Sequence, residues 1–352
     1  MSIPHGLEVD LQITNRCPLT CDHCVYDSRM TEGEGLPPAI LPRLLDECVQ
    51  LGVEQISITG GEPFVRDDLL DVVAMAAGRG FEVCVQTSGL LVDRIDFARV
   101  RDSGLDLLLV SIDGLSAYHE EFRHHRGLFD RALRTIEQAV GHGLPVRINT
   151  VVTRSNASQV VDLLPVAERL GVDVFSFFYL SPVGRGMHHQ HEVLSFSEWQ
   201  TVESAVRRWC LHNRRSDRMR IKVQNVATSL ADIPPEGQQC RIKDRDNILI
   251  LANGDVYPCV FLCHQPDLCL GNVVDDSLIR LWRSSAAWTD AYDPFFQLSG
   301  RDCRCGPANN CSGGCPAFRR LLRRADGHCD RRCEHATSGL APGCAREYTL
   351  VQ

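Results

Sequence analysis

The stretch Asn15-Arg16-Cys17-Pro18-Leu19-Thr20-Cys21-Asp22-His23-Cys24 places three cysteines within eight residues, directly after an apolar, strand-like segment, Leu7 to Thr14. A tetrahedral thiolate site takes four ligands. Three local thiols without an obvious fourth therefore indicate an iron–sulfur cluster with one iron left open. A small chelating ligand could bind that iron and receive electrons from the cluster. The alternative is a structural zinc loop, which usually uses paired Cys-x2-Cys groups and would need a fourth thiol from elsewhere in the chain.

Composition limits the classes of protein that this chain can belong to. Its 352 residues are 44% apolar, enough for one large domain and a smaller one. The 37 basic and 45 acidic residues give a net charge of −8, which disfavours nucleic acid as a partner. The N-terminus has no secretion signal, and no apolar run is long enough to span a membrane, so we expect a cytoplasmic protein. Its 17 cysteines then indicate metal or cluster ligation rather than disulfides.

Strand-like and helix-like segments alternate through the first half of the chain. The expected strands are short, apolar and rich in β-branched or aromatic residues: Leu7–Thr14, Gln55–Thr59, Glu82–Thr87, Leu107–Ile112, Arg147–Val152 and Val174–Tyr179. The amphipathic segments between them are expected helices: Ile40–Leu51, Leu69–Arg79, Phe129–Gly141 and Ser158–Leu170. This order predicts an α/β fold with a parallel sheet. Barrel and Rossmann topologies both fit, but no Gly-x-Gly-x-x-Gly fingerprint follows the first strand, which disfavours the Rossmann alternative.

Changes of composition predict three regions. Residues 1–190 form the α/β core, and residues 191–239 form a bridging helix (Ser195–Asn213) followed by a polar linker. Residues 240–352 hold eleven cysteines and little helical periodicity beyond Ser277–Arg283 and Pro316–Arg324. We expect this last region to be organised by metal rather than by a large apolar core.

The spacing Cys-x3-Cys-x2-Cys resembles that of the radical S-adenosylmethionine (SAM) superfamily. Thr59-Gly60-Gly61-Glu62-Pro63 ends the second expected strand, where this superfamily carries a Gly-Gly-Glu-Pro motif. The resemblance implies that the glycines let the backbone approach the SAM amino group. Glu62 or a backbone carbonyl then accepts a hydrogen bond from that amino group. The position is also the one expected of a ligand site, at the carboxyl end of a strand.

Later strand ends extend the resemblance. Thr87-Ser88-Gly89 resembles a Thr-Asn-Gly turn of the family, and Ser111-Ile112-Asp113-Gly114 resembles a segment that contacts the SAM carboxylate or ribose. Any one of these segments alone equally fits ordinary turn chemistry, but their order on successive strands is specific. The resemblance covers residues 7–190 and implies a partial (β/α)6 TIM-like barrel. The implied SAM-binding residues are Gly60, Gly61, Glu62, Pro63, Thr87, Ser111, Asp113, Asn149 and, near the adenine edge, Arg185.

The cysteines of the second half resemble the SPASM domain, an extension of radical SAM enzymes that carries two auxiliary [4Fe–4S] clusters. Cys240 is followed by thirteen residues, Gly254, four residues and Cys259, and a second group runs from Cys303 through Cys305 and Cys311 to Cys315. One departure from the family pattern is that a single residue separates Cys303 from Cys305, where the family has two.

The resemblance also implies ligand sets. Cys240, Cys259 and Cys315 belong to the first auxiliary cluster, whose fourth ligand is Cys263, Cys269 or absent. Cys303, Cys305, Cys311 and either Cys329 or Cys333 hold the second cluster, and Cys344 has no assigned role. A pair of zinc ribbons is the alternative, which the triplet Cys17, Cys21 and Cys24 in the same chain disfavours.

These resemblances imply a reaction. An electron from a flavodoxin- or ferredoxin-type donor reduces the first cluster, SAM is cleaved, and a 5′-deoxyadenosyl radical abstracts hydrogen from the substrate. The auxiliary clusters then accept an electron, so net oxidation is the expected outcome. No residue is predicted as the proton acceptor.

The substrate class is left between alternatives. SPASM enzymes mostly modify ribosomal peptides, and others oxidise aminoglycoside or aminocyclitol alcohols. The chain begins at the first barrel strand without a fused leader-peptide domain. This weakens the case for a peptide substrate without excluding it, because the recognition domain can be a separate protein. Val260 stands where sulfatase-maturing relatives place an aspartate base, which argues against that activity. Peptide modification is preferred over alcohol oxidation. A non-catalytic iron–sulfur or zinc protein is disfavoured, because it has no use for Gly60, Gly61 and Glu62.

Overall fold

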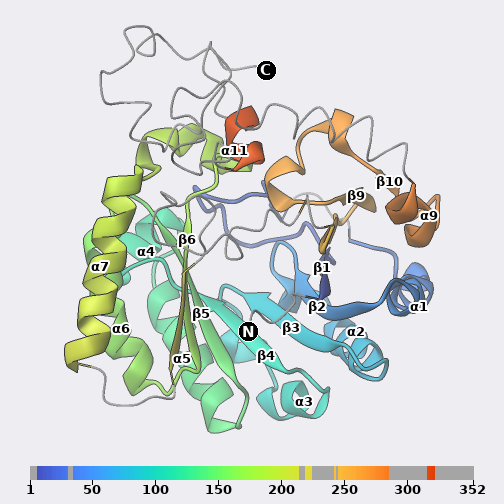
Figure 1. Ribbon diagram of the computed structural model, residues 1–352. Helices are drawn as coiled ribbons and strands as arrows, with labels where there is room; N and C mark the ends of the chain where they lie inside the picture. The colour runs from blue at the N-terminus through green and yellow to red at the C-terminus, as the bar shows by residue number, and fades with distance from the viewer. Residues whose placement is uncertain are drawn as a thin grey trace, which may run out of the picture.

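One ten-stranded sheet forms the centre of the molecule (Figure 1). The structure is a computed structural model that describes residues 6–30, 35–213, 219–223, 242, 245–284 and 315–321. The strand order is β10-β9-β8-β1-β2-β3-β4-β5-β6-β7. All neighbours from β8 through β7 are parallel, while β9 and β10 are antiparallel.

The strands are β1 (Leu7–Gln12), β2 (Val53–Thr59), β3 (Glu82–Thr87), β4 (Leu107–Ser111), β5 (Val146–Val152), β6 (Val174–Tyr179), β7 (Arg220–Val223), β8 (Asn247–Ile250), β9 (Asp255–Tyr257) and β10 (Gly271–Asn272). The α-helices are α1 (Leu41–Leu51), α2 (Leu69–Ala77), α3 (Phe97–Asp102), α4 (Ser116–Phe122), α5 (Leu128–Gly141), α6 (Val160–Arg169), α7 (Phe196–Asn213), α9 (Leu278–Arg283) and α11 (Pro316–Leu321). Short 3-10 helices are η1 (Pro38–Ile40), η2 (Pro63–Val65), η3 (Val92–Arg94), η4 (Ala157–Gln159), η5 (Gly184–Glu192), η7 (Val260–Leu262) and η8 (Pro266–Leu268).

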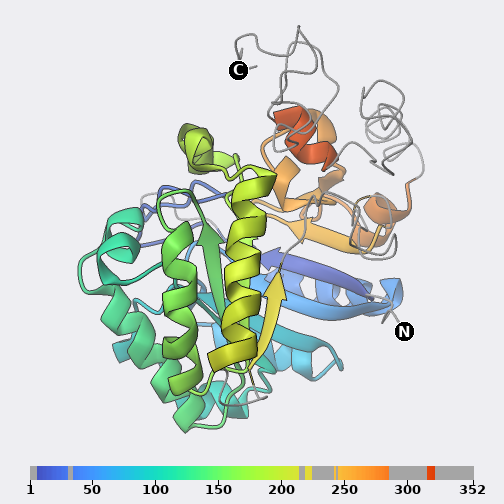
Figure 2. The ribbon, with the colours of Figure 1, turned by 60° about the vertical axis from the view of Figure 1, so that its left-hand side comes forward.

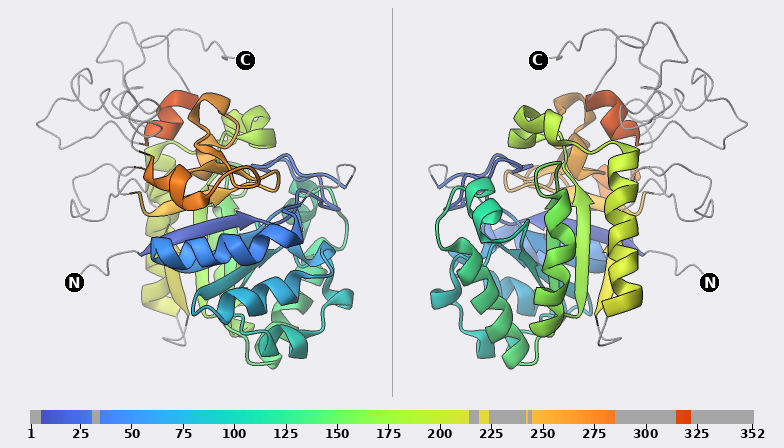
Figure 3. Two further views of the ribbon diagram at one scale, coloured as in Figure 1. Left: turned by 90° about the vertical axis from the view of Figure 1, so that its right-hand side faces the viewer. Right: turned by 90° about the vertical axis from the view of Figure 1, so that its left-hand side faces the viewer.

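Strand β5 shows how the sheet separates its two faces. Val146, Ile148 and Val152 are buried in the main hydrophobic core. Arg147 and Asn149 alternate with them and are only partly buried, because successive side chains of a strand point to opposite faces. Figures 2 and 3 show the helices around the outside of the curved sheet. The core therefore lies between the sheet and its helices, and the inner face is left for polar residues.

The outer layer follows from the predicted helical spacing. Leu41, Leu44, Leu45 and Cys48 recur at helical intervals and are almost completely buried on α1. Gly52 ends this helix with φ +76°, a left-handed conformation that glycine adopts without strain. The parallel α/β fold and the partial barrel are thus confirmed.

The sheet extends beyond residue 190 at both edges. β7 lies within the segment interpreted as a polar linker, and β8 pairs in parallel with β1. The sequence of β7, Arg-Ile-Lys-Val, is short and half polar, so its period of two is hard to distinguish from a linker. The division into residues 1–190, 191–239 and 240–352 stays a prediction.

Polar contacts fasten the second half to the barrel at α1. The guanidinium of Arg43 donates to the carbonyl oxygens of Val273 (2.6 Å) and Asp276 (3.3 Å). The carboxylate of Glu47 accepts from the backbone N–H of Leu278 at 2.7 Å, at the start of α9. Figure 1 shows α9 beside α1, and β9 and β10 form the edge of the sheet beyond β8.

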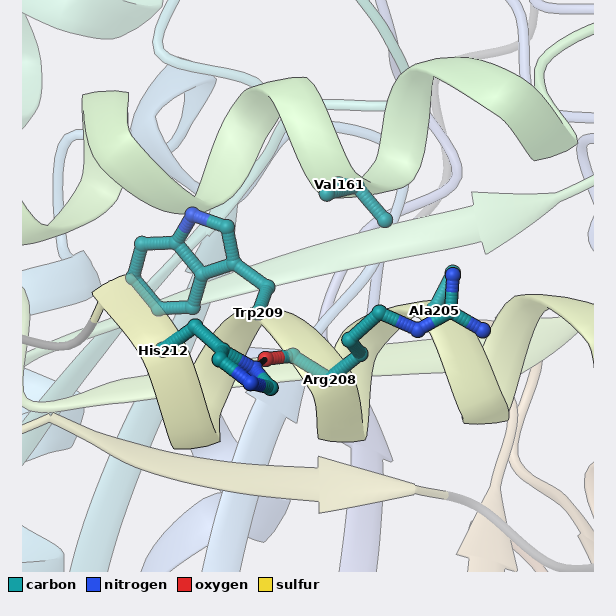
Figure 4. Close-up of a pocket in the computed structure, with 5 residues that line it drawn as sticks. All are labelled: Val161, Ala205, Arg208, Trp209 and His212. Atoms are coloured by element: carbon teal, nitrogen blue, oxygen red, sulfur yellow. Dashed lines mark hydrogen bonds between the residues drawn. The ribbon is translucent and has the colours of Figure 1, made fainter.

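The outer helical layer contains a depression of about 340 Å³ between α6 and α7. It is lined by Val161, Ala205, Arg208, Trp209 and His212 (Figure 4). It lies in the helical layer outside the sheet rather than at the strand ends.

Within the described residues, no helix is both long and apolar enough to cross a membrane.

Candidate functional site

The three-cysteine loop follows β1 at the carboxyl end of the sheet. Cys17 and Cys21 are buried and pack with the apolar side chains of Leu19, Leu90 and Leu128, while Cys24 is partly exposed. The backbone N–H of Cys24 donates to the carbonyl of Cys21 at 3.3 Å. The backbone N–H of Ser28 donates to the Cys24 sulfur at 3.4 Å. The loop thus shields the Cys17 and Cys21 thiols from water and leaves Cys24 partly accessible.

The donor set fits a thiolate-bound cluster. Burial raises the pKa of the Cys17 thiol to about 12 and that of Cys21 to about 11, while nearby Arg123 and Arg185 act against this rise at Cys21. A bound metal deprotonates such thiols outright. In the described part of the chain, no three His, Cys, Asp or Glu side chains converge closely enough to hold one metal ion. A single zinc ion needs sulfurs about 2.3 Å from one centre, whereas the ligands of a cluster bind different irons.

Gly60 and Gly61 bring the end of β2 against this loop. The Gly61 N–H donates to the Thr14 carbonyl at 2.7 Å, and the Glu62 N–H donates to the Arg16 carbonyl at 2.9 Å. A β-carbon at Gly60 would lie 2.7 Å from the Thr14 carbonyl oxygen, and one at Gly61 only 2.2 Å from that of Arg16. The glycines are therefore required by the packing of this motif on the cysteine loop. Pro63 is buried and begins η2.

Glu62 joins the ends of β2 and β3. Its side chain is 0% exposed, and burial raises its pKa against the effect of several hydrogen bonds. The carboxylate accepts from the Thr87 hydroxyl (2.8 Å), from the Ser88 N–H (2.9 Å) and hydroxyl (2.5 Å), and from the Phe64 N–H (3.4 Å). Glu62 and Thr87 thus shape the two turns. Their contact with SAM stays a prediction.

A buried charge network surrounds Asp113, at the turn after β4. Its carboxylate accepts from Arg123 Nε at 2.6 Å and from the Val151 N–H at 3.0 Å. Burial would raise the pKa of Asp113, but Arg123 first, and then His23 and His119, hold it well below its usual range. This carboxylate is therefore charged and already paired. Arg123, on the chain just after α4, was not among the predicted site residues.

His23 connects this network to the cysteine loop. Its imidazole stacks on Phe122 with ring centroids 4.5 Å apart, and its Nε2 lies 3.3 Å from the Arg123 guanidinium. Burial lowers the pKa of His23 to about 4, so the ring is neutral at pH 7. The loop between Cys21 and Cys24 is thereby positioned by the end of α4.

Ser111 and Asn149 occupy adjacent positions on the inner face. They are paired in register on β4 and β5, and Ser111 is the last residue of its strand. Among the described residues, no atom is within hydrogen-bonding distance of the buried Oδ1 of Asn149. Such an atom on the inner face, beside the end of β4, fits a polar ligand there. The assignment of both residues to SAM stays a prediction.

Arg185 lies across the cysteine loop. Its Nε donates to the Cys21 carbonyl at 2.7 Å, and its Nη1 donates to Asp27 Oδ1 at 2.7 Å and to the Ser28 carbonyl at 3.1 Å. Its backbone N–H also donates to the Cys24 carbonyl at 3.0 Å. These bonds make Arg185 a residue that fixes the shape of the cluster loop. Its predicted place at the adenine edge is untested.

We expect Arg185→Met to weaken the binding of iron to this loop by about tenfold or more, as loss of a residue that orients metal ligands does. The measurement is iron retained per chain after anaerobic reconstitution and challenge with a chelator. Arg29→Met is the matched control, because Arg29 pairs with the same Asp27 but is exposed. Equal iron retention in the two variants would contradict the role of Arg185.

Only part of the second cysteine set lies within the described residues. Cys263 and Cys315 are buried, Cys259 and Cys269 are partly buried, and the Cys269 thiol donates to the Gly271 carbonyl at 3.4 Å. The predicted ligands Cys240, Cys303, Cys305, Cys311, Cys329 and Cys333, and also Cys344, lie outside the described residues. The ligand sets of the auxiliary clusters therefore stay predictions.

The segment that carries Cys263 contacts the cluster loop. His264 Nε2 hydrogen-bonds to the Val25 carbonyl at 2.6 Å. Tyr26 packs in one apolar cluster with Cys263. Burial raises the pKa of Tyr26 well above its usual range, and the charges of Asp10 and Cys263 raise it further. Tyr26 was not predicted as a site residue. The signal that the sequence offered was an aromatic side chain two positions after Cys24, the third cysteine of the triplet.

Comparison with known families matches two segments of the chain. Residues 11–167 match the radical SAM superfamily, and residues 240–316 match an iron–sulfur cluster-binding domain, SPASM. An AdoMet-dependent heme synthase of Oleidesulfovibrio alaskensis is 28% identical, covering 90% of this chain and 86% of the relative. A mycofactocin maturase, MftC of Mycobacterium ulcerans, is 27% identical, covering 89% of this chain and 85% of the relative.

Solved structures share the fold. SuiB of Streptococcus suis, bound to S-adenosylmethionine, superposes with a TM-score of 0.77 at 20% identity, covering 94% of this chain and 77% of SuiB. anSMEcpe with bound AdoMet gives a TM-score of 0.69 at 16% identity, covering 94% of each chain. The fold and the two matched segments agree with the order of motifs along the sequence, and the two domains imply SAM and iron–sulfur clusters. The chain belongs to the radical SAM superfamily and carries a C-terminal SPASM domain.

Proposed function

We propose that this chain is an oxidoreductase that removes hydrogen from a peptide during the maturation of a natural product. When bound, the reduced cluster and SAM supply one-electron cleavage to a 5′-deoxyadenosyl radical. The protein holds, orients and shields these groups. Cys17, Cys21 and Cys24 hold the cluster, Arg185 and His23 fix their loop, and the strand ends from Gly60 to Asn149 bind SAM.

The contact between the Cys263 segment and the cluster loop carries the proposal of net oxidation. The His264–Val25 hydrogen bond and the packing of Tyr26 on Cys263 bring the SPASM half against the residues that follow Cys24. This arrangement supports transfer of an electron from a substrate radical at the barrel mouth to an auxiliary cluster. We propose two such clusters, with the ligands named from the sequence, and an external flavodoxin- or ferredoxin-type donor for the first cluster.

The names of relatives support the substrate class. A relative named mycofactocin maturase matches this chain almost end to end, and SuiB has been solved with its precursor peptide SuiA. We therefore propose a peptide substrate, presented by a separate leader-peptide recognition protein. A porphyrin is the second candidate, because heme synthases match 90% and 87% of this chain. Oxidation of an aminocyclitol alcohol is the alternative to be excluded by the same assay.

The test is anaerobic turnover with a precursor peptide encoded beside the gene. We expect the peptide to lose two hydrogens for each 5′-deoxyadenosine formed, measured by mass spectrometry and chromatography of one reaction. Cys259→Ala should stop this product because it removes a proposed auxiliary ligand, whereas Cys210→Ala, on α7, is the matched control and should keep it. Loss of hydrogen from an iron porphyrin or an aminocyclitol, with the peptide unchanged, would contradict the peptide proposal.

A further inference from the structure

Three cationic side chains gather on the inner face of the sheet at β5 and β7. Arg147 on β5 is paired with Val174 on β6, which is paired with Arg220 on β7. Lys222 lies two residues beyond Arg220 and points to the same side. We call Arg147, Arg220 and Lys222 the cation cluster. β7 is the yellow arrow in Figure 2, at one edge of the sheet.

Their neighbours establish the direction in which these side chains point. Phe175 and Ile221, which alternate with them, pack in the core beneath the helices. The Arg147 guanidinium lies 5.5 Å from the ring centroid of Phe178, an inward residue of β6. The charge of Glu8, across the barrel on β1, acts on both Arg147 and Lys222. The cation cluster therefore lies on the inner face of the sheet, where Arg147 is partly buried and Arg220 and Lys222 are exposed.

The cluster lacks the partners that a structural ion network would have. Throughout the described ranges, no carboxylate lies within ion-pairing distance of Arg147, Arg220 or Lys222. Buried polar atoms beside it also have no hydrogen-bond partner: Arg147 Nε, Asn149 Oδ1 and Ser176 Oγ. Ser176 is fully buried. Buried polar atoms without partners destabilise a fold unless a ligand or water satisfies them.

The like charges also act on one another. Partial burial lowers the pKa of Lys222, and the neighbouring Arg147 lowers it further. Three adjacent cations in a chain of net charge −8 are not part of a generally basic surface. An anion placed among them would relieve the repulsion and accept the hydrogen bond that Arg147 Nε lacks.

The position of the cluster relates it to the SAM-binding strand ends. Ser111, Asn149, Ser176 and Lys222 form one row across β4, β5, β6 and β7. Neighbouring strands are about 4.8 Å apart, so Lys222 lies roughly 10 Å from Asn149 along this row. A ligand held at Lys222 would therefore extend towards the residues assigned to SAM.

We propose that the cation cluster binds a carboxylate of the substrate, so that the molecule oxidised is an acid. The planar guanidinium of Arg147 offers two parallel N–H donors, and Lys222 offers a point charge. This inference rests on the proposed function, because it places the substrate on the inner face of the barrel. A peptide and a porphyrin acid share this chemistry.

Amine labelling tests the site directly, because Lys222 and Lys243 are the chain's only lysines. The anaerobically reconstituted enzyme is treated with sulfo-N-hydroxysuccinimidyl acetate, and both lysines are followed by peptide mapping, with Lys243 as the internal reference. The first pair of probes is a mixture of tripeptides with free carboxyl groups and the corresponding tripeptide amides. The second pair is coproporphyrin III and its tetramethyl ester, which has no free carboxyl group. When the concentration of the acid is ten times its dissociation constant, binding should slow the labelling of Lys222 about tenfold relative to that of Lys243.

Variants test the geometry. Arg147→Met should abolish protection by the acid, and Arg147→Lys, which keeps the charge but loses the fork, should weaken it. Arg169→Gln is the matched control, because it removes an exposed cation from the outer helix α6, and should leave protection intact. A circular-dichroism melt identifies any variant that has not folded, and protection by the wild-type chain still decides the matter.

Each outcome decides the proposal. Protection by only the peptide acids, or by only the porphyrin acid, supports it and names the source of the carboxylate. Equal protection by the acids and their neutral partners overturns it, as does protection by neither acid. Labelling measures binding and not turnover. If the acid protects Lys222 but no 5′-deoxyadenosine forms, the proposed function is contradicted and this inference is not. If turnover occurs but the acid does not protect Lys222, this inference is contradicted and the proposed function is not.

Discussion

Replacing Arg123 by methionine is expected to lower the free energy of unfolding by about 3–5 kcal/mol. Arg123 Nε lies 2.6 Å from the carboxylate of Asp113, and both side chains are buried. Without the guanidinium, Asp113 would keep a buried charge with no partner of opposite sign, which is among the costliest single changes in a folded protein. Urea unfolding followed by tryptophan fluorescence measures the loss.

Two further variants separate this effect from the general loss of an arginine. Arg134→Met removes an exposed guanidinium 3.3 Å from Asp93 and should cost less than about 1 kcal/mol. Adding Asp113→Asn to Arg123→Met should recover part of the loss, because no buried charge then remains. An Arg123→Met protein as stable as Arg134→Met would show that the network contributes little.

The same pair gives a dependence on pH. Arg123 holds the pKa of Asp113 below its usual range in the folded chain. A depressed carboxylate pKa contributes stability above the unfolded value, about pH 4, and that stability is lost as the pH falls through the folded value. The difference in stability between the wild type and the double variant should therefore shrink as the solution is acidified below about pH 4.

The elements that local pattern specifies were predictable. β3 and β6 begin and end at the predicted residues, because each is a short apolar run between turns. The cysteine triplet and Gly60-Gly61 could be singled out from the sequence, since cluster and turn chemistry impose local spacing, and their roles in binding the cluster and SAM stay predictions. The physical role of the glycines was only half predicted. They let β2 approach Arg16 and Cys17, a contact between segments more than forty residues apart in sequence.

What was missed depends on contacts that join distant residues. Arg123 pairs with Asp113 and His23 only after α4 returns to the cysteine loop. Arg185 was predicted as a site residue, but its hydrogen bond to the Cys21 carbonyl, 164 positions away, was not. The bond of His264 to Val25, 239 positions away, was not predicted either. No local period identifies such partners. β7 was missed for another reason, because its four residues alternate too briefly to distinguish a strand from a polar linker.

The formation of 5′-deoxyadenosine by the reconstituted enzyme tests the central claim, that the Cys17, Cys21 and Cys24 thiols hold the cluster that starts the reaction. Each thiol would bind a different iron of one cluster, so loss of any of them should prevent electron transfer to SAM. The loss of 5′-deoxyadenosine formation should therefore be complete rather than partial. The effect of Cys17→Ala should not depend on the auxiliary clusters, whose proposed ligands all lie after residue 239.

Wild-type and Cys17→Ala proteins are reconstituted with iron and sulfide, reduced with dithionite and incubated with SAM, with Cys210→Ala as the matched control. The account predicts equal amounts of 5′-deoxyadenosine and methionine from the wild type and from Cys210→Ala, and only background from Cys17→Ala. Cleavage of SAM by Cys17→Ala at the wild-type rate would contradict it.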